Sequence, residues 1–374
     1  MSLWHGLGLE QLAGFDVDAG SVVDFFWQGM TSTSAKVRSR VPFGAKERVV
    51  IARLAAVGMF VAALAITGIF AGAAPSARRV DAAAGACDRA CLDGFVDQYL
   101  AALLAHDPSR APLAKDVKFT ENGQILKVGD ALWGTISGFG KYKFYFEDPQ
   151  DGQVGFFGTI RENDVPAILA VRLKVQDQKI TEIETVVPRF DNTDDKDGPE
   201  ELDTMDKPNP VYAETVTEAE RIPRQKMIAI VNSYFDGLEK ATGKDIPFDP
   251  QCDRLNNGEL TTNNHAANSP ILAMGCAEQF NSGFSKFMTR IRDRRFMLFD
   301  EERGLIFGVV FFDHAGRLKT VTLTKGATFQ VPPVYRKPTT LMVAELFKIK
   351  AGKILRIDAV EGWVTYGVKP GWSN

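Results

Sequence analysis

The pattern of apolar and polar positions predicts the same types of element twice along the chain. In FVDQYLAALLAHD (residues 95–107), apolar residues recur at every third or fourth position, which is typical of one face of an α-helix. The segment IVNSYFDGLEKAT (residues 230–242) has the same spacing. FYFEDPQDGQVGFFG (residues 144–158) predicts two strands joined by an acidic turn with a glycine, and FMLFDEERGLIFG (residues 296–308) repeats that pattern.

A third pair of segments alternates apolar and polar residues and predicts two further strand hairpins. These segments are AILAVRLKVQDQKITEIETVV (residues 167–187) and MVAELFKIKAGKILRIDAVE (residues 342–361). Between the helix and the first hairpin of each set, FTENG (residues 119–123) matches RLNNG (residues 254–258). Further helices are expected at residues 128–138 and 276–291. Because the blocks occur in the same order and only their spacers differ, the sequence indicates a duplicated domain.

The duplication sets the expected domain boundaries. We expect the first domain at residues 85–190 and the second at residues 222–374. Residues 191–221 begin with DNTDDKDGPEELDTMDKP, which is strongly acidic and has no apolar face, so we expect a solvated linker there. The second copy has two insertions, an Asn-rich loop at 256–270 and a segment at about 313–340. Helices separated from a run of antiparallel strands place both copies in the α+β class.

The residues before the first copy contain an export signal or a membrane anchor. Residues 54–74 carry no charge, basic residues precede them and small residues follow, which is the order of a secretory signal peptide. Their length also fits a membrane-spanning helix, so residues 49–80 have two interpretations. Residues 1–48 show no sustained periodicity and are interpreted as an unstructured extension or a start codon assigned too early. If residues 49–80 are a signal peptide, the protein is expected to be periplasmic or secreted. If they are an anchor, it is expected to be membrane-anchored and to face outside.

The four cysteines, Cys87, Cys91, Cys252 and Cys276, fit such a location. An even number of cysteines beyond an export signal indicates two disulfides. Three pairings exist, of which Cys87–Cys91 together with Cys252–Cys276 keeps each bridge inside one copy. A metal site would need more histidines or thiols, and His265 is the single histidine between the second pair, so no metal is expected.

Composition argues against several classes of function. The net charge of −3 gives no basic footprint for a nucleic acid. The sequence has no glycine-rich phosphate loop, no G-x-S-x-G and no H-E-x-x-H, which argues against nucleotide enzymes, hydrolases and zinc proteases. We therefore expect no cofactor. The 26 phenylalanines suit an aromatic core or pocket, so the expected partner is a small hydrophobic or aromatic molecule.

Two stretches resemble the NTF2-like superfamily, which includes nuclear transport factor 2, ketosteroid isomerase and the SnoaL polyketide cyclases. They are QYLAALLAHDPSRAPLAKDVKFTENG (residues 98–123) and the hairpin RLKVQDQKITEIE (residues 172–184). The resemblance covers residues 85–190 and, more loosely, 222–365, and looks closest to an uncharacterised group of exported double-domain members. It implies two tandem cone-shaped domains, each with helices on a curved antiparallel sheet around a pocket, that pack as an internal dimer.

The resemblance to ketosteroid isomerase implies a catalytic carboxylate at Glu121 and a hydrogen-bonding tyrosine at Tyr99. An apolar pocket raises the pKa of a carboxyl group toward the working range of a general base, and a phenol donates to a developing oxyanion. Asn122, the next residue, is a candidate ligand contact. The alternative is structural, with Glu121 and Asn122 capping a turn and Tyr99 in the core.

The second copy departs from this arrangement at two positions. Asn256 replaces Glu121, so the first carboxylate is missing. Glu345 stands where the first copy has Val171, on an apolar strand face that it shares with Phe347. A carboxyl group on such a face needs a partner or a raised pKa. The second pocket is therefore expected to be the more polar one.

Two interpretations of Glu345 stay open from the sequence. It acts as a catalytic acid or base together with Tyr234, or it is a structural acid paired with Arg292 or Arg294. The arginine-rich segment 289–304 likewise binds an anion or pairs with its own acidic residues across the hairpin. The candidate ligand contacts of the second copy are Asp253, Asn256, Asn257, His265, Arg292 and Trp363.

Two classes of function agree with these observations. The first is cofactor-independent acid–base chemistry by a lyase, isomerase or cyclase on a small hydrophobic or aromatic compound. The second is a non-catalytic module that binds such a compound, or a structural pair of domains with filled cones. The sequence leaves open whether the protein is an enzyme, and a titratable acid that faces an open pocket would favour the first class.

Overall fold

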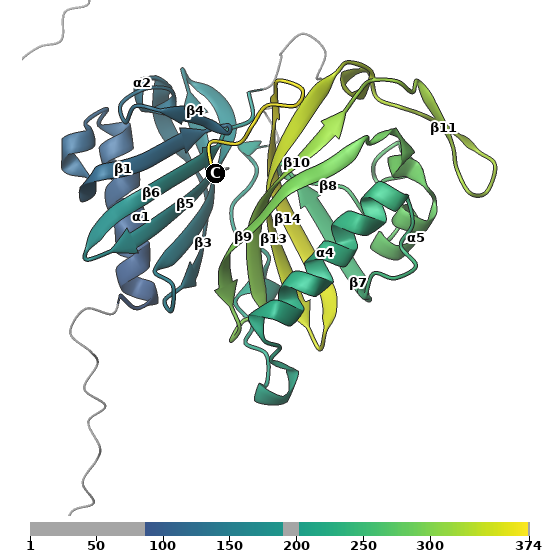
Figure 1. Ribbon diagram of the computed structural model, residues 1–374, viewed down its shortest axis with the longest axis horizontal. Helices are drawn as coiled ribbons and strands as arrows, with labels where there is room; N and C mark the ends of the chain where they lie inside the picture. Colours follow the sequence, from purple (N-terminus) through teal and green to yellow (C-terminus); the bar gives the residue numbers. More distant parts are fainter. Residues whose placement is uncertain (1–86, 190–201, 373–374) are drawn as a thin grey trace, which may run out of the picture. The chain divides into compact units, whose positions relative to one another are not determined.

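The computed structural model describes residues 87–189 and 202–372, which build two six-stranded sheets (Figure 1). The strand order in the first sheet is β2 (Gln124–Leu126), β1 (Leu113–Glu121), β6 (Lys179–Val186), β5 (Val165–Gln176), β4 (Gln153–Glu162) and β3 (Ile136–Asp148). The order in the second sheet is β8 (Glu259–Leu260), β7 (Phe248–Asn256), β14 (Lys353–Val364), β13 (Thr339–Lys350), β10 (Leu305–His314) and β9 (Arg290–Asp300). Strand β1 pairs with β6 in parallel, as β7 does with β14, and the other neighbours are antiparallel.

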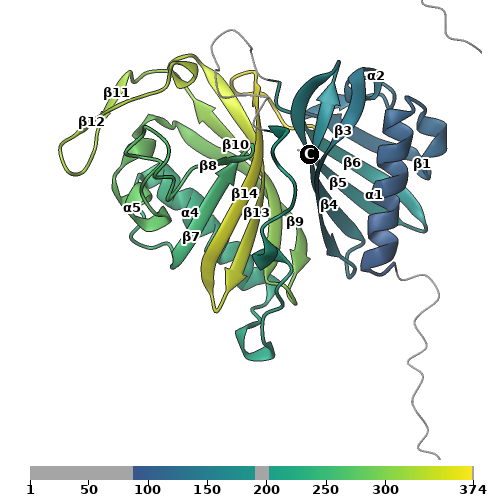
Figure 2. The same cartoon turned by 180° about the vertical axis from the view of Figure 1, so that it is seen from behind.

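One long helix packs on a face of each sheet. Helix α1 (Arg89–Leu104) crosses the first sheet, and α4 (Arg224–Lys240) crosses the second (Figures 1 and 2). Helix α1 begins after Asp88, whose side chain accepts a hydrogen bond of 2.9 Å from the backbone N–H of Cys91. The apolar residues at helical spacing are the buried ones, among them Val96 and Tyr99 in α1 and Val231 and Tyr234 in α4.

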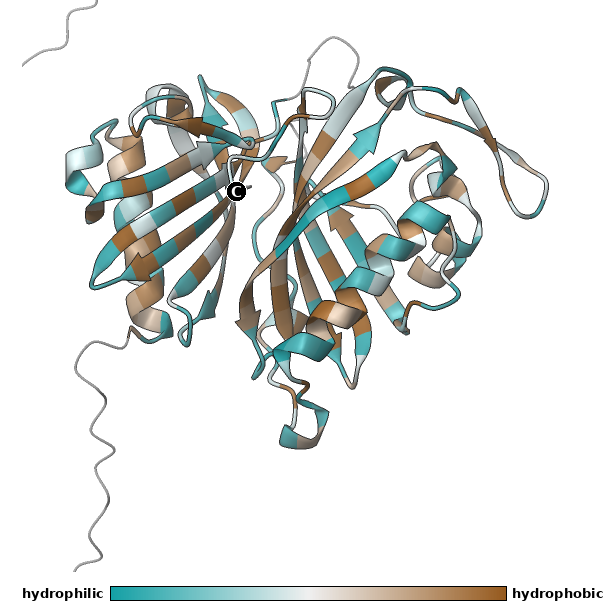
Figure 3. Cartoon of the chain, in the orientation of Figure 1, coloured by the Kyte–Doolittle hydropathy of each residue, from teal (hydrophilic) through white to brown (hydrophobic). Residues whose placement is uncertain are grey.

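Each helix and its sheet enclose an apolar core. In the first domain, Val96 and Leu103 pack with Phe156 and Leu169 of the sheet. In the second, Phe235 of α4 packs with Phe347 of β13. Apolar and polar residues alternate along strands such as β1 and β6 (Figure 3), whereas β10 and β13 are buried on both faces.

The prediction of two tandem α+β domains is confirmed, because both sheets have the same strand order and each carries its helix. The repeated acidic hairpins that revealed the duplication are the turns between β3 and β4 and between β9 and β10. Their glycines, Gly152 and Gly304, both adopt left-handed φ angles of 60° and 65°. Glycine is favoured at both positions because a side chain would strain this backbone conformation.

The remaining faces of the two sheets contribute to a further apolar cluster. Phe146 and Phe157 of the first sheet lie with their ring centroids 5.2 Å and 6.1 Å from that of Phe307 in the second. At the border of this cluster, Arg295 of β9 forms an ion pair with Glu184 of β6. Part of the phenylalanine excess therefore serves packing between the sheets rather than a ligand pocket.

Two predicted helices are much shorter in the structure. The stretch 128–138 contains only α2 (Leu132–Thr135), because the edge strand β3 already begins at Ile136. The stretch 276–291 contains α5 (Cys276–Asn281) and a short 3₁₀ turn (Phe284–Phe287) before β9 begins. Apolar residues at helical spacing therefore served strand and turn positions in these two segments.

The prediction of two disulfides is confirmed, with Cys87 bonded to Cys91 and Cys252 bonded to Cys276. The first bond lies at the start of α1. The second joins β7 to the first residue of α5 and thereby fixes this short helix over the second sheet. Each bond stays inside one copy, as local pairing requires.

The expected N-terminal extension at residues 1–48 and the signal or anchor at residues 49–80 lie outside the described residues. Most of the acidic stretch of the linker, residues 190–201, lies outside them as well. Within residues 87–189 and 202–372, no helix is long and apolar enough to cross a membrane.

Candidate functional site in the second domain

A cavity of about 250 Å³ lies inside the second domain, between the sheet and α5. Its wall is largely aromatic and aliphatic, which suits a small organic molecule. Polar side chains from three strands and one helix interrupt this wall. They are Arg254 and Asn256 of β7, Gln279 of α5, His314 of β10 and Glu361 of β14.

Arg254 places a fixed positive charge on the cavity wall. Its side chain is only 7% exposed, and its Nη1 donates a hydrogen bond of 2.7 Å to Oε1 of Gln279. The amide nitrogen of Gln279 in turn donates to the backbone oxygens of Thr261 and Ile271, at 2.6 Å and 3.0 Å. The guanidinium lies 5.7 Å from the ring centroid of Tyr234, which adds a cation–π contact. Its Nε has no hydrogen-bond partner among the described residues.

Glu345 is the most deeply buried acid of this site. It lies on the helix-facing side of β13, is 2% exposed, and its Oε1 accepts a hydrogen bond of 3.0 Å from the hydroxyl of Tyr234. Its Oε2 is buried and has no hydrogen-bond partner within the described part of the chain. Burial raises the pKa of Glu345 to about 7, although the nearby Arg254 and the Tyr234 hydroxyl act to lower it. The group can therefore exist in both protonation states near neutral pH.

Glu361 supplies a second carboxyl group on the same side of the sheet. The side-chain amide of Asn256 donates to it over 3.2 Å, and burial raises its pKa. Its backbone is fixed by Asn257, which accepts from the N–H of Glu361 and donates to its C=O, both at 2.9 Å. Asn257 thus positions Glu361 without facing the cavity itself.

His314 and three aromatic rings form one end of the site. His314 is 0% exposed, and neither ring nitrogen has a hydrogen-bond partner among the described residues. Its ring centroid lies 4.7 Å from that of Tyr335 and 5.7 Å from that of Phe287. Burial lowers the pKa of His314 to about 4, so the imidazole is neutral at physiological pH. Trp363, 39% exposed, covers Tyr335 from outside at 5.2 Å.

The first domain provides an internal comparison for the buried charges. Phe119 lies opposite Ile183 as Arg254 lies opposite Ile357, and Val171 and Glu345 also hold matching register positions. Asn122 bonds to both backbone groups of Val187, as Asn257 does to those of Glu361. The aligned pairs are Phe119 with Arg254, Val171 with Glu345, and Val187 with Glu361.

The comparison of the two domains shows which buried residues the fold requires and which are particular to the site. The first domain builds the same sheet with three apolar residues where the second has one arginine and two glutamates. Burying charged groups is unfavourable unless they are paired, so three such replacements in one domain are not a requirement of the fold. Arg254 and Glu361 line the cavity and Glu345 is buried near Arg254, so these three are the candidate functional residues.

The candidate acid of the first domain has a different environment. Oε1 of Glu121 accepts from Nη2 of Arg189 at 2.8 Å, and Oε2 accepts from the backbone N–H of Leu132 at 3.0 Å. Both oxygens of Glu121 are therefore engaged, one of them at the start of α2. Tyr99 packs its ring edge-to-face on Trp133 at 5.5 Å, and burial raises its pKa far above the usual range.

Three other predicted contacts lie away from the cavity wall. Asp253 accepts a hydrogen bond of 2.6 Å from Asn263, and His265 is exposed on the Asn-rich loop. Arg292 donates to Asp313 at 2.9 Å. Arg294 is bonded to Asp236 at 2.6 Å, so neither of the two arginines considered as partners of Glu345 is bonded to it. The arginine-rich strand thus pairs with acidic residues.

Several residues of the site were not identified from the sequence. Arg254 was detectable, because it opens RLNNG at the position of the phenylalanine that opens FTENG. No sequence pattern marks Gln279 and His314, because the residues that they contact in the site are distant in the sequence and become neighbours only in the folded chain. Tyr335 lies in the insertion, for which the first copy has no counterpart. No group of three or more metal-binding side chains occurs in residues 87–189 and 202–372.

A comparison with protein families finds a match within the second domain. Residues 220–361, which include Arg254, Glu345 and Glu361, match a family described as "Domain of unknown function (DUF8021)". No curated protein matches the chain.

Solved structures similar to the chain include three small proteins. One is an NTF2-like protein of unknown function from Cytophaga hutchinsonii, with 12% identity over 26% of this chain and 88% of that chain, and a TM-score of 0.22. A putative polyketide cyclase from Xanthomonas campestris has 15% identity over 37% and 90%, with a TM-score of 0.23. TerC, co-crystallized with polyporic acid, has 12% identity over 36% and 89%, with a TM-score of 0.21.

Proposed function

We propose that the second domain binds a small organic molecule in its cavity and exchanges a proton with it, without a cofactor. The observation that carries this proposal is the replacement of three apolar residues of the first domain by Arg254 and Glu361, which line the cavity, and by Glu345, which is buried near Arg254. Buried acids with raised pKa values and a specific charged neighbour are typical of functional sites. The reaction class is an isomerisation, lyase or cyclisation step that begins with removal of a proton.

In this proposal each group has a separate role. Arg254 holds an anionic or carbonyl oxygen of the ligand, since its charge is fixed in place by Gln279. Glu345 accepts or donates the proton, and Tyr234 orients its carboxyl group. The rings of Phe287 and Tyr335 contact the apolar body of the ligand. Such a general base normally contributes about 10²–10⁴-fold in rate.

A second candidate function is binding without chemistry. It is favoured by one observation: Arg254 and Glu361 line the cavity, whereas Glu345 is enclosed behind them. In that case Glu345 adjusts the charge balance around Arg254, and the domain captures or carries its ligand.

Deuterium exchange separates the two candidates without knowledge of the product. Aryl ketones and arylpyruvates are incubated with the protein in D₂O, and loss of the proton next to the carbonyl group is followed by NMR. Glu345→Gln should reduce the exchange rate by about 10²-fold or more while binding persists. The matched control is Glu218→Gln, which changes an exposed acid before α4 and should leave exchange unchanged.

Two results would contradict the proton-transfer proposal. If the wild type binds these probes but does not exchange their protons, the second candidate function, binding without chemistry, is the one supported. Loss of exchange in Glu121→Gln but not in Glu345→Gln would move the site to the first domain.

We also propose that the protein works outside the cytoplasm. Two disulfides are typical of proteins in an oxidising compartment, and the apolar run 54–74 precedes them in the sequence. Fractionation of the native host and N-terminal sequencing test this. A full-length chain with four free thiols in the cytosol would refute it.

A further inference from the structure

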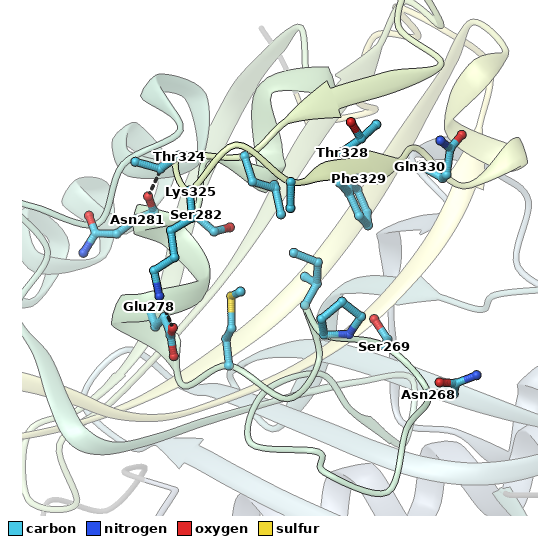
Figure 4. A pocket seen from close by; sticks show the side chains of 15 residues that line it. Asn268, Ser269, Glu278, Asn281, Ser282, Thr324, Lys325, Thr328, Phe329 and Gln330 are labelled. Atoms are coloured by element: carbon cyan, nitrogen blue, oxygen red, sulfur yellow. Dashed lines mark hydrogen bonds and ion pairs between the residues drawn. The ribbon is translucent and has the colours of Figure 1, made fainter.

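A second and larger cavity, of about 540 Å³, lies beside the site, in the part of the second domain that the first lacks. Figure 4 shows it between α5 and a two-stranded arm formed by β11 (Thr320–Thr322) and β12 (Thr328–Gln330). Most of the surface that lines it is apolar, and six of its fifteen lining residues have apolar side chains: Pro270, Ile271, Met274, Leu323, Ala327 and Phe329. Glu278 and Lys325, 3.2 Å apart, form an ion pair in its wall.

The two cavities are neighbours that share part of their walls. Ser269, Ile271 and Phe329 line both of them. On one side of these residues lie Arg254 and Glu361, and on the other lies the apolar wall under the β11–β12 arm. These shared side chains separate the two cavities, so a ligand that displaces them and spans both would meet a charged group at one end and apolar side chains at the other.

The arm occurs in the same copy as the buried charges. In the first domain, β4 passes directly into β5 through a turn at Asn163 and Asp164. In the second domain, residues 315–338 separate β10 from β13 and contain the arm. The chain thus adds an apolar chamber to the domain that has Arg254, Glu345 and Glu361. Both additions therefore concern the same copy.

We propose that the ligand of the second domain is an elongated amphipathic monocarboxylate, with its carboxylate at Arg254 and its apolar chain in the chamber under the β11–β12 arm. This inference rests on the proposed function, because it names the class of molecule that the same site takes. The carboxylate complements the guanidinium, whose Nε is unpartnered among the described residues. The apolar chain replaces contacts that an empty apolar chamber lacks.

A homologous series of straight-chain carboxylates from two to sixteen carbons tests the inference. Binding is measured by titration calorimetry and by quenching of tryptophan fluorescence, to which the half-exposed Trp363 near the site contributes. Affinity should rise by about fourfold for each added methylene until the chamber is filled, and then level off. An affinity that stays constant along the series would overturn the proposal.

Two variants place the chain in this chamber. Ala327→Trp adds a large side chain at an exposed position that lines the chamber, and Leu323→Trp does so from its buried wall. Each should abolish the gain for long chains and leave the affinity for short carboxylates within about twofold. Val334→Trp is the matched control, since Val334 is exposed on the same insertion and lies outside both cavity walls. Equal effects of all three substitutions would refute the assignment.

The outcomes also separate this inference from the proposed function. Short aryl compounds that bind and exchange their proton, together with a carboxylate affinity that does not rise with chain length, would agree with the proposed function. They would refute the inference that the ligand is an amphipathic carboxylate. If long carboxylates bind tightly and neither Ala327→Trp nor Leu323→Trp changes their affinity, the carboxylates bind outside this chamber and the inference is likewise refuted. Absence of both exchange and carboxylate binding would contradict the proposed function itself.

Discussion

The hydroxyl of Tyr234 in α4 donates a hydrogen bond of 3.0 Å to the carboxyl group of Glu345 in β13. The two residues are 111 positions apart in the chain, and both are buried. The aligned pair in the first domain is Tyr99 and Val171, so the tyrosine is common to both copies whereas the acid is not. Tyr234 therefore has a carboxyl partner that its counterpart lacks.

Removal of this hydroxyl should change how Glu345 titrates. Tyr234→Phe removes a donor that lowers the pKa of Glu345, so this pKa should rise further above 7. The pH midpoint of deuterium exchange should move upward accordingly, and the free energy of unfolding should fall by about 1 kcal/mol. Tyr99→Phe is the matched control and should leave the midpoint in place. A midpoint that is the same in both variants would show that Tyr234 does not set the ionisation of Glu345.

Substitution of Glu345 by the residue of the first copy should stabilise the protein at alkaline pH. The pKa of Glu345 is raised from 4.5 to about 7 by burial, so the folded state retains a proton that the unfolded state releases. Stability of the wild type should therefore fall as the pH rises from about 4.5 to 7, by about 3 kcal/mol in total. Glu345→Val removes this loss. Urea unfolding at pH 5 and pH 8 measures it, and a gain that is larger at pH 5 than at pH 8 would contradict the raised pKa.

His314 should act on stability in the opposite direction. Burial lowers its pKa from 6.5 to about 4, so below pH 6.5 the unfolded state binds a proton that the folded state does not. The wild type should lose about 3 kcal/mol as the pH falls from about 6.5 to 4. His314→Phe keeps an aromatic ring beside Tyr335 and removes this loss. Unfolding curves of the two proteins should therefore diverge below pH 6.5, and parallel curves would refute the assignment.

These two contributions overlap between about pH 4.5 and 6.5 and have opposite signs. In the wild type they should largely cancel, so stability changes little in this range through these groups. Each single variant exposes the remaining slope, which is positive with pH in Glu345→Val and negative in His314→Phe. The double variant should restore a flat profile if the two groups titrate independently.

The sequence predicted the duplication because it is a local property that recurs. Helical spacing around Tyr99 and Tyr234 and the paired acidic hairpins are visible in short segments. Glu345 was identified for the same reason, since alignment of the copies shows an acid opposite a valine. Arg254 is visible in the same alignment as an arginine that replaces Phe119, but the resemblance to ketosteroid isomerase points to the position of Glu121, two residues further along.

The remaining parts of the site depend on contacts between distant segments. Gln279 reaches Arg254 from a short helix whose place is fixed by a disulfide, and no periodicity marks it. His314 is the last residue of β10 and becomes part of the cavity wall only when the insertion folds over it. The bonds of Glu121 to Arg189 and to the N–H of Leu132 join residues that are 68 and 11 positions apart in the chain. Chain-local patterns contain no information on such contacts.

The bond between Cys252 and Cys276 should matter more to the site than to the rest of the fold. It closes a loop with a sequence separation of 24 and joins β7, which carries Arg254, to α5, which carries Gln279. Replacement of both cysteines by alanine should lower the free energy of unfolding by about 3 kcal/mol, against about 2 kcal/mol for the shorter Cys87–Cys91 loop.

Binding should distinguish the two bonds more clearly than stability does. Without Cys252–Cys276, α5 is released from β7, and Gln279 no longer holds the guanidinium of Arg254 in position. The affinity for carboxylate probes should then fall by about tenfold or more, because the side chain of Arg254 loses conformational entropy when the ligand orders it, and this loss opposes binding. The variant without Cys87–Cys91, whose bond lies at the start of α1, should keep wild-type affinity. Titration of both variants under conditions where each is folded makes the comparison, and equal affinities would show that the disulfide does not position Arg254.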